Sequence, residues 1–464
     1  MLTLEKHRIW QRFVTNGFLK LQIPSTVHSH ILAKLRSNIN SQINPGNNIL
    51  PLVPQLNEII TNQKLREILT LILGERYICH PHRYCHFIEP GTKEQDLHRD
   101  TYCSDYPVHH YRPRWLLVFY YPHHVTSDMG PTKVIPGSHY SPGKPDTQSE
   151  ELIVEPGTLV ITHYDLWHHA GANNSEHERF MVKFLFTRLS EPHEAIKTKQ
   201  PSNRFEPGSP ESDVNFWYRG HDSTISSLNK SVDQIKLSEI ITSNSFKDIQ
   251  KVRAACLLGS TGVSGAEISA RLLIEEANKT SNLTTKDLDQ TSLKNPAQMF
   301  PRYSLVTAGK AGTKITEDLL ADPNPIVRAT AADALGDSGL LSKSSVISLS
   351  DKINDSNLWV RRNVVEALGN SKEEQYLAME LLNTALQDSE VQVRLNAVQS
   401  TIKLGCPSNT DIKKLIKSLS DSDRYIRYMA CIALLSGGPE ANKAATDYLQ
   451  ASYWCPLTSP TDPY

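Results

Sequence analysis

Residues 167–180, WHHAGANNSEHERF, place two adjacent histidines, an Ala-Gly turn, an Asn pair and an arginine directly before an apolar run. That run, FMVKFLF at 180–186, carries apolar side chains at every second position, which is typical of a β-strand. Two earlier runs, WLLVFYY at 115–121 and TLVIT at 158–162, also read as strands. The front half of the chain is therefore predicted to be β-rich.

Helices are expected beside these strands. HRIWQRFVTNGFLKL at 7–21 and VHSHILAKLRSNI at 27–39 both have helical character. Residues 190–212 are rich in Pro, Ser and charged residues, which indicates an exit from the domain or a covering loop. We place the end of the front domain near residue 215.

The C-terminal half repeats a motif at a step of 33 residues. Each copy begins with Asp and carries Arg six places later, as Asp322 and Arg328, Asp355 and Arg361, Asp388 and Arg394, and Asp421 and Arg427. Apolar and small residues recur at three- and four-residue spacing after each Arg, which marks one helix face. A less regular copy surrounds Arg253. A fixed period of helix pairs predicts a solenoid.

This motif resembles HEAT-like repeats of the PBS-lyase type. The Asp and Arg residues that recur in it have two interpretations: a ladder that binds a ligand, or an Asp–Arg pair that locks consecutive turns together. We expect the second, because Arg and carboxylate pair well in such a stack.

The composition excludes several classes of protein. A chain of 464 residues is long enough for two or three domains. Its 49 basic and 50 acidic residues give a formal net charge of −1, so neither nucleic acid nor an anionic membrane is an expected partner. The seven scattered cysteines form no Cys-x-x-Cys, and no apolar run approaches the ~18 residues of a membrane span. With no signal-peptide pattern at the start, we expect a cytoplasmic protein.

Candidate metal ligands lie in DLHRD, where His98 and Asp100 are two residues apart. At a strand end, two such ligands can point to one side, and a later histidine can complete a 2-His-1-carboxylate face on Fe(II). The same spacing recurs in His163 and Asp165, but no later histidine stands in a comparable setting. We interpret this second pair as strand-end residues.

An ordered series of motifs follows DLHRD: a strand, GPTKVIPGSH at 130–139, EPGTLVI at 155–161, WHHAGAN at 167–173, then Arg179 and a final strand. Over roughly residues 10–190, this series resembles the phytanoyl-CoA dioxygenase family of Fe(II)/2-oxoglutarate oxygenases. The resemblance implies a double-stranded β-helix, a jelly-roll or cupin-like fold. In the family the distal histidine stands five residues before the Asn and eleven before the Arg, and both counts select His168.

The resemblance assigns Fe(II) to His98, Asp100 and His168, and the distal carboxylate of the cosubstrate 2-oxoglutarate to Arg179. Two neutral imidazoles and one carboxylate leave room on iron for the cosubstrate and O2. An Arg offers a permanently charged fork that suits a carboxylate. The other interpretation of Arg179 is an ordinary surface salt bridge. His169 is expected to face the opposite side and to hydrogen-bond or pack.

The resemblance also implies a reaction, in which a substrate C–H bond is hydroxylated or otherwise oxidised and succinate and CO2 are released. Iron halogenases related to this family carry Ala or Gly at the carboxylate position, so Asp100 favours hydroxylation. No basic cluster suits a coenzyme A diphosphate, and we expect a small metabolite as substrate. Pro136–His139 is expected to be a structural turn and not a ligand.

Three hypotheses of different class stand side by side. In the first, an active oxygenase is fused to a solenoid that recruits a protein partner, self-associates or packs over the pocket. In the second, the front half is a non-catalytic ligand-binding or scaffold module, although all four site residues are intact. In the third, the same triad binds zinc or another metal in a cupin-like hydrolase, which leaves Arg179 without a purpose.

The expected domain organisation is an oxygenase domain at 1–215, a linker at 216–245, HEAT-like repeats at 246–450 and a tail at 451–464.

Overall fold

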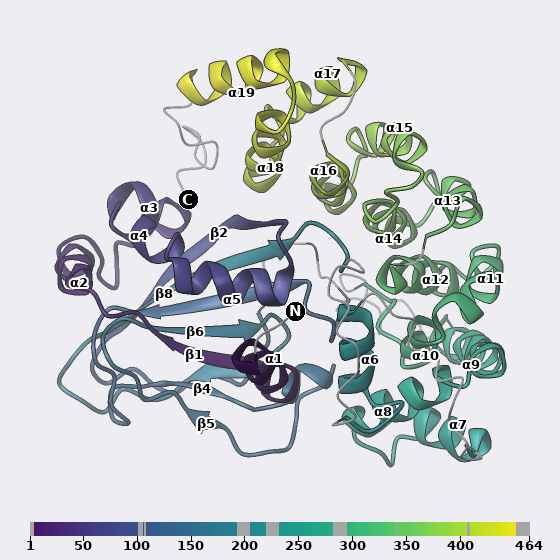
Figure 1. Ribbon diagram of the computed structural model, residues 1–464, viewed down its shortest axis with the longest axis horizontal. Helices are drawn as coiled ribbons and strands as arrows, with labels where there is room; N and C mark the ends of the chain where they lie inside the picture. Colours follow the sequence, from purple (N-terminus) through teal and green to yellow (C-terminus); the bar gives the residue numbers. More distant parts are fainter. Residues whose placement is uncertain are drawn as a thin grey trace. The chain divides into compact units, whose positions relative to one another are not determined.

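The structure is a computed structural model, and it describes residues 4–100, 105, 108–192, 205–219, 232–281, 295–339, 341–405 and 409–451. The chain forms two compact units (Figure 1). The β-rich unit contains residues up to Asp100 and His110–Ser190, and the helical unit contains Thr101–His109 and Glu191–Pro456. Residues 220–231 of the expected linker and 452–464 of the expected tail lie outside the described residues.

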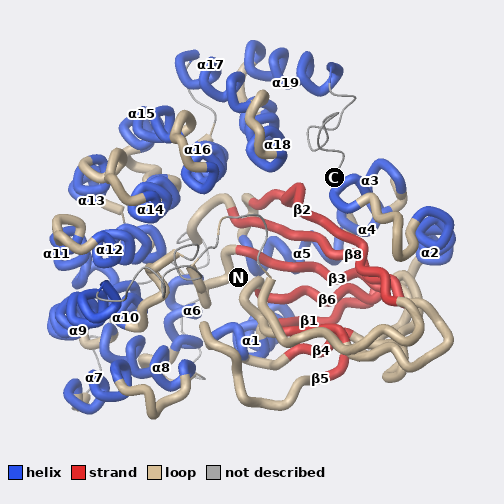
Figure 2. Tube along the Cα trace, turned by 180° about the vertical axis from the view of Figure 1, so that it is seen from behind, coloured by secondary structure: helices blue, strands red, loops and turns tan. Residues whose placement is uncertain are grey.

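The strands of the β-rich unit form two antiparallel sheets. They are β1 (Phe18–Gln22), β2 (Tyr77–Ile88), β3 (Trp115–Tyr121), β4 (Thr132–Val134), β5 (Glu150–Glu151), β6 (Thr158–His163), β7 (His168–Ala170) and β8 (Arg179–Arg188). The large sheet has the order β1-β6-β3-β8-β2 and the small one β5-β4-β7 (Figure 2). This arrangement confirms the predicted jelly-roll class and the three strands expected from sequence.

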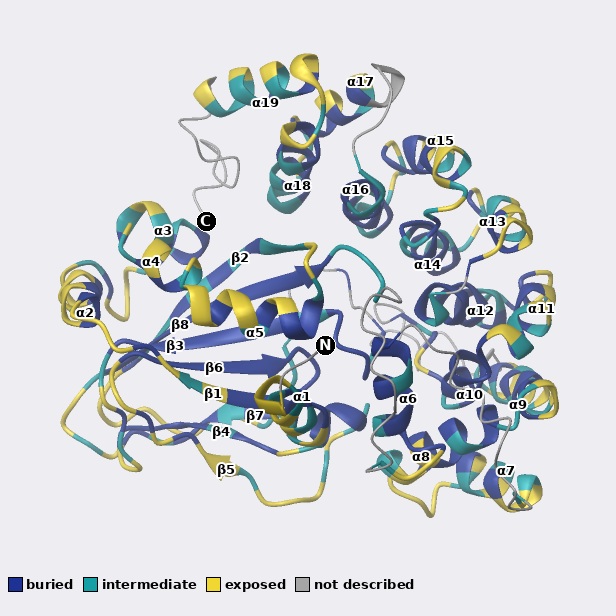
Figure 3. Cartoon of the chain, viewed as in Figure 1, coloured by how far each residue is buried: buried dark blue, intermediate teal, exposed yellow. Residues whose placement is uncertain are grey.

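Helices accompany this unit at its N-terminal end. They are α1 (Leu4–Asn16), α2 (Val27–Asn38), α3 (Ile49–Leu52), α4 (Leu56–Ile60) and α5 (Gln63–Leu73), with a 3-10 turn at Gly46–Asn48. Figures 1 and 2 place α1 and α5 on one face of the large sheet, away from the small sheet. Because one face meets helices and the other meets the second sheet, the central strands β3, β6 and β8 are buried along nearly their whole length (Figure 3).

The expected helix at 7–21 is only partly correct. Helix α1 ends at Asn16, and FLKLQ is the edge strand β1, paired antiparallel with β6. Gly17 has a φ of 77°, which an L side chain rarely adopts, so the chain leaves the helix here. Pairing with β6 then overrides the helical pattern of the following residues.

The helical unit begins with α6 (Pro210–Tyr218) and continues as antiparallel pairs. The remaining helices are α7 (Gln234–Thr242), α8 (Asp248–Gly259), α9 (Val263–Ser281), α10 (Pro301–Thr307), α11 (Gly309–Leu319), α12 (Pro325–Ser338), α13 (Lys343–Ser350), α14 (Leu358–Leu368), α15 (Gln375–Ala385), α16 (Val391–Leu404), α17 (Asn409–Ser418), α18 (Arg424–Leu435) and α19 (Pro439–Ala451). Helices α10, α12, α14, α16 and α18 contact one another in turn and form one row of the solenoid. No helix among the described residues is both long and apolar enough to cross a bilayer.

Arg–Asp pairs join consecutive repeats, as the sequence predicts. Arg361 bonds Asp388 through Nε at 2.7 Å and Nη2 at 3.0 Å, and its Nη1 donates to the carbonyl of Asp355. Arg328 and Arg394 make the same contacts one repeat earlier and one repeat later. Each guanidinium therefore ties the loop of its own repeat to the loop of the next, which is a structural lock and not a ligand ladder.

We predict that Arg361→Gln lowers the free energy of unfolding of the helical unit by about 2 kcal/mol, because it removes charge-assisted hydrogen bonds at a half-buried loop junction. Urea denaturation followed by circular dichroism measures this loss. Lys314→Gln is the control, because Lys314 pairs with Asp318 in full contact with solvent. An Arg361→Gln curve that overlays the Lys314→Gln curve would contradict the lock.

Acid should weaken the same lock. Burial alone would raise the pKa of Asp388. The Arg361 guanidinium lowers it by more than burial raises it, so the pKa lies below the usual range. A carboxylate with a depressed pKa stabilises the fold fully above its unfolded pKa of about 3.9 and loses this contribution as pH falls through the folded pKa. Below about pH 4, wild-type stability should therefore fall more steeply than that of Asp388→Asn; urea titrations that give parallel pH dependences would disprove this.

Candidate metal centre

Backbone pairing brings the predicted ligands together. His98 and His168 form an isolated antiparallel bridge, with His98 N–H on the carbonyl of His168 at 3.0 Å and the reverse bond at 2.9 Å. His168 begins β7 of the small sheet. The two imidazoles therefore project from neighbouring backbones, with ring centroids 4.8 Å apart.

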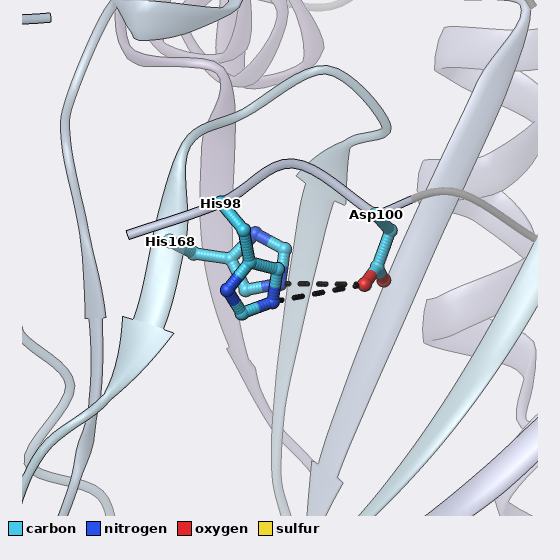
Figure 4. Close-up of side chains that lie close together, drawn as sticks. All are labelled: His98, Asp100 and His168. Atoms are coloured by element: carbon cyan, nitrogen blue, oxygen red, sulfur yellow. Dashed lines mark ion pairs between the residues drawn. The ribbon is translucent and has the colours of Figure 1, made fainter. Parts of the chain in front are cut away.

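Both histidines present Nε2 to Asp100 (Figure 4). Asp100 Oδ1 lies 4.0 Å from His98 Nε2 and 3.9 Å from His168 Nε2. The opposite ring nitrogens, Nδ1, donate to backbone carbonyls, at 2.7 Å to Asp96 and 2.9 Å to Leu166. Because a carbonyl only accepts, Nδ1 holds the proton and Nε2 keeps its lone pair free. Burial lowers the pKa of His168, which favours this neutral form.

Lys183, on β8, is a site residue that the sequence reasoning missed. Its ammonium donates to Asp100 Oδ2 at 2.8 Å and is buried. Burial alone would raise the pKa of Asp100, but the charge and the hydrogen bond of Lys183 hold it well below its usual range. With Oδ2 taken by Lys183, Oδ1 is the oxygen turned toward the two Nε2 atoms.

The neighbours of the ligands in sequence face elsewhere. Successive side chains of a strand alternate, so His169 points away from His168 and contacts Glu94 and the carbonyl of Gln95. Arg99 pairs with Asp165 at 2.7 Å and stacks over Trp167. The second His-x-Asp pair thus supplies an anchor for Arg99, and neither of its residues belongs to the group of His98, Asp100 and His168.

Arg179 is the first residue of β8 and is 1% exposed. Its Nη1 donates to the hydroxyl oxygen of Thr132 at 3.0 Å, and Tyr121 donates to the same oxygen at 2.7 Å. Among the described residues, its Nε has no hydrogen-bond partner, and no carboxylate lies within ion-pair distance of the guanidinium. The surface salt bridge considered for Arg179 does not exist within this part of the chain; a buried cation without a counter-charge is costly and calls for an anion.

Arg179 and Lys183 lie on the same face of β8. They are four residues apart, which corresponds to about 13 Å along a strand. Across the sheet, His86 of β2 pairs with Met181 between them, and its Nε2 is buried without a partner. Burial and the Lys183 charge hold the pKa of His86 well below its usual value, so its ring is neutral. His86, Thr132 and Tyr121 were not predicted, because only the sheet register reveals which side chains share the interior.

The glycine-rich motifs position the small sheet. Gly130 has a φ of 66°, and a Cβ there would meet the carbonyl oxygen of Gly171 at 2.7 Å. Only glycine allows this close approach between the segments that lead to β4 and follow β7. Gly137 is left-handed and opens the 3-10 turn Ser138–Tyr140, which confirms the predicted structural turn. His139 packs against His163 inside the unit and is not near the ligand group.

The comparisons with known families agree with the expected domain order. Residues 47–181 match the phytanoyl-CoA dioxygenase family model. Residues 313–402 match the model of HEAT repeats. The two matches confirm the predicted order, a domain similar to the phytanoyl-CoA dioxygenase family followed by HEAT-like repeats. A search of the curated proteins finds no match.

Several solved structures are similar to part of this chain at low sequence identity. The non-heme alpha-ketoglutarate-dependent epimerase SnoN from nogalamycin biosynthesis is 15% identical, with 40% of this chain and 82% of that chain covered and a TM-score of 0.35. EctD from S. alaskensis with bound Fe is 18% identical, with 40% and 77% covered and a TM-score of 0.34. AviO1 from Streptomyces viridochromogenes Tue57 is 14% identical, with 40% and 96% covered and a TM-score of 0.32.

In the metal-free protein, we predict that Lys183→Met raises the pKa of Asp100, because the burial that opposes ionisation stays while the nearest cation is removed. Carbon-detected NMR titration of the carboxyl groups measures the change. Lys133→Met, which removes a lysine paired with Glu94 and Glu151, is the control. An Asp100 titration curve that is the same in all three proteins would show that Lys183 does not hold this carboxylate.

Proposed function

We propose that the chain is an Fe(II)- and 2-oxoglutarate-dependent dioxygenase that hydroxylates, or otherwise oxidises, a C–H bond of a small metabolite. His98, Asp100 and His168 would hold Fe(II), and Arg179 would hold 2-oxoglutarate by its distal carboxylate. Bound together, iron and 2-oxoglutarate supply the oxidising power with O2, and succinate and CO2 leave as co-products.

The observation that carries this proposal is the buried Arg179. A cation that is 1% exposed and has no acidic partner among the described residues is matched to an anion from outside. Its unpartnered Nε is a donor still free for such a carboxylate. Thr132 and Tyr121 add hydroxyl groups at the same place, so a carboxylate bound there would be held by both charge and hydrogen bonds.

The group of His98, Asp100 and His168 fits a divalent iron ion. Two neutral Nε2 atoms and one carboxylate oxygen come from one side, and all three ligand atoms lie within 4.8 Å of one another. This donor set is that of 2-His-1-carboxylate iron oxygenases, which keep the opposite positions open. The backbone bonds at both Nδ1 atoms and the Lys183 bond at Asp100 hold the ligands in orientation, as outer-shell contacts do in metal sites.

The residues between the proposed iron ligands and Arg179 indicate what kind of substrate could bind. Phe119 of β3 packs against the His168 ring, with centroids 5.4 Å apart, and Met181 of β8 lies between Arg179 and Lys183. These apolar groups exclude water near the ligands, while the neutral His86 offers one polar contact. An interior of this kind suits a small, partly apolar molecule.

The test is an anaerobic titration of metal-free protein with Fe(II) and then 2-oxoglutarate, followed by the visible charge-transfer band of the chelate. Wild-type protein should give the band, and His168→Ala should lose it together with iron binding. Arg179→Gln should bind iron normally but need about 100-fold more 2-oxoglutarate, because a desolvated charge pair is removed. Succinate release on mixing with O2 provides a second readout.

His169→Ala is the matched control, because it removes the adjacent imidazole without touching the ligand group. It should keep both the band and the wild-type affinity for 2-oxoglutarate. Iron binding without a band in wild-type protein would overturn the 2-oxoglutarate assignment and leave a ligand-binding or scaffold module. A preference for zinc with no 2-oxoglutarate effect would favour the hydrolase alternative.

A further inference from the structure

The interior beside the ligand group holds two buried cations and one carboxylate. Arg179 is 1% exposed and Lys183 is 6% exposed, and Lys183 forms an ion pair with Asp100. Among the described residues, neither cation has any other carboxylate within ion-pair distance. The two imidazoles of the ligand group and that of His86 are neutral, for the reasons given above. The described part of this interior therefore carries one positive charge more than its own residues balance.

Iron and 2-oxoglutarate would leave this excess unchanged. Fe(II) is a divalent cation, and 2-oxoglutarate, whose two carboxyl groups are both ionised at neutral pH, is a dianion, so the pair adds no net charge. The distal carboxylate would pair with Arg179, and the carboxylate of Asp100 would be shared between iron and Lys183. The uncompensated charge is then the ammonium of Lys183. A buried charge is costly unless an opposite charge lies beside it.

The ammonium of Lys183 also has hydrogen-bond donors to spare. It carries three N–H groups, and among the described residues it has a single acceptor, Asp100 Oδ2 at 2.8 Å. One donor is enough to orient Asp100, and a neutral amide side chain could supply that donor without bringing a charge into the interior. The orientation of Asp100 therefore does not account for a cation at this position.

The neighbours of Lys183 define the rest of the binding surface. Phe119 of β3 pairs with Lys183 in the sheet register, so both side chains point to the same face. Met181 lies two residues before Lys183 and pairs with His86 of β2, whose Nε2 is buried without a partner among the described residues. A molecule bound here would meet a cation and a neutral imidazole on one side and apolar groups on the other.

We propose that the substrate is a small carboxylic acid and that Lys183 binds its carboxylate. The inference rests on the proposed function, because the charge balance includes Fe(II) and 2-oxoglutarate. A carboxylate carries a single negative charge, which matches the excess, whereas a phosphate monoester carries about 1.5 to 2. Because Lys183 contacts the ligand residue Asp100, the acid group of the substrate would lie beside the ligand group.

The experiment measures binding to full-length protein loaded anaerobically with Fe(II) and saturating 2-oxoglutarate, with the charge-transfer band as the proof of loading. The probes are two pairs of similar shape, acetate with acetamide and phenylacetate with phenylacetamide. Ligand-observed NMR gives the dissociation constant of each probe. Wild-type protein should bind each acid at least about tenfold more tightly than its amide, because a buried hydrogen bond to a charged group is stronger than one to a neutral group.

Three variants assign the preference to Lys183. Lys183→Gln keeps a donor for Asp100 and removes the charge, and Lys183→Met removes both, so each should bind acid and amide about equally. Lys183→Arg keeps the cation and should keep the preference. Lys133→Met is the matched control, because Lys133 pairs with Glu94 and Glu151 away from the ligand group, and it should keep the wild-type ratio. Lys183→Gln decides the matter if Lys183→Met does not load with iron.

The possible outcomes separate the two proposals. Loaded wild-type protein that binds acids and amides equally, or that fails to bind acetate measurably, overturns the substrate class and leaves the proposed function standing. A preference for acids that survives in Lys183→Gln and Lys183→Met overturns the role of Lys183. Wild-type protein that gives no charge-transfer band overturns the proposed function, and the charge balance behind this inference falls with it.

Discussion

The candidate site depends on one piece of backbone pairing, the antiparallel bridge between His98 and His168. These residues are seventy positions apart, and each arrives from a loop or a short strand with little structure of its own. Once their amides and carbonyls pair, both imidazoles face Asp100, and their Nδ1 atoms have no better acceptors than the nearby carbonyls. The relative position of the two imidazoles follows from this pairing, and the Nδ1 contacts set the tautomer of each ring.

Both units contain buried charged side chains, and these differ in whether a counter-charge lies beside them. In the β-rich unit, Asp100 has a cation beside it, whereas Arg179 has no carboxylate within reach among the described residues. The charge of Asp100 is balanced, whereas that of Arg179 has no counter-charge among the described residues, and this asymmetry is the basis for proposing that Arg179 binds an anion. In the helical unit, Arg328, Arg361 and Arg394 each pair with the aspartate of the next repeat, so these three arginines have a structural role.

One short segment from the front half of the sequence is grouped with the repeats. A solenoid stacks by contacts between neighbours, and such contacts need nothing from the front half of the sequence. Yet Arg362, which breaks the repeat pattern, pairs with Asp105, and Tyr303 pairs with His109. The segment Thr101–His109 is grouped with the helical unit, although the residues on either side of it in sequence belong to the β-rich unit.

Much of this protein was determined by sequence alone, where the signal is local or periodic. Strand alternation gave β3, β6 and β8, the 33-residue step gave the repeats and their Arg–Asp lock, and motif spacing nominated His98, Asp100, His168 and Arg179. The turn at Gly17 was missed, because strand pairing with β6 outweighs the helical pattern of FLKLQ. Only the tertiary structure placed Lys183, His86, Thr132 and Tyr121 around the site, since sheet register and not sequence distance decides which side chains share an interior. For the same reason, no reading of the repeats could pair Arg362 with Asp105: a buried charge finds its partner in space, and these two are 257 residues apart.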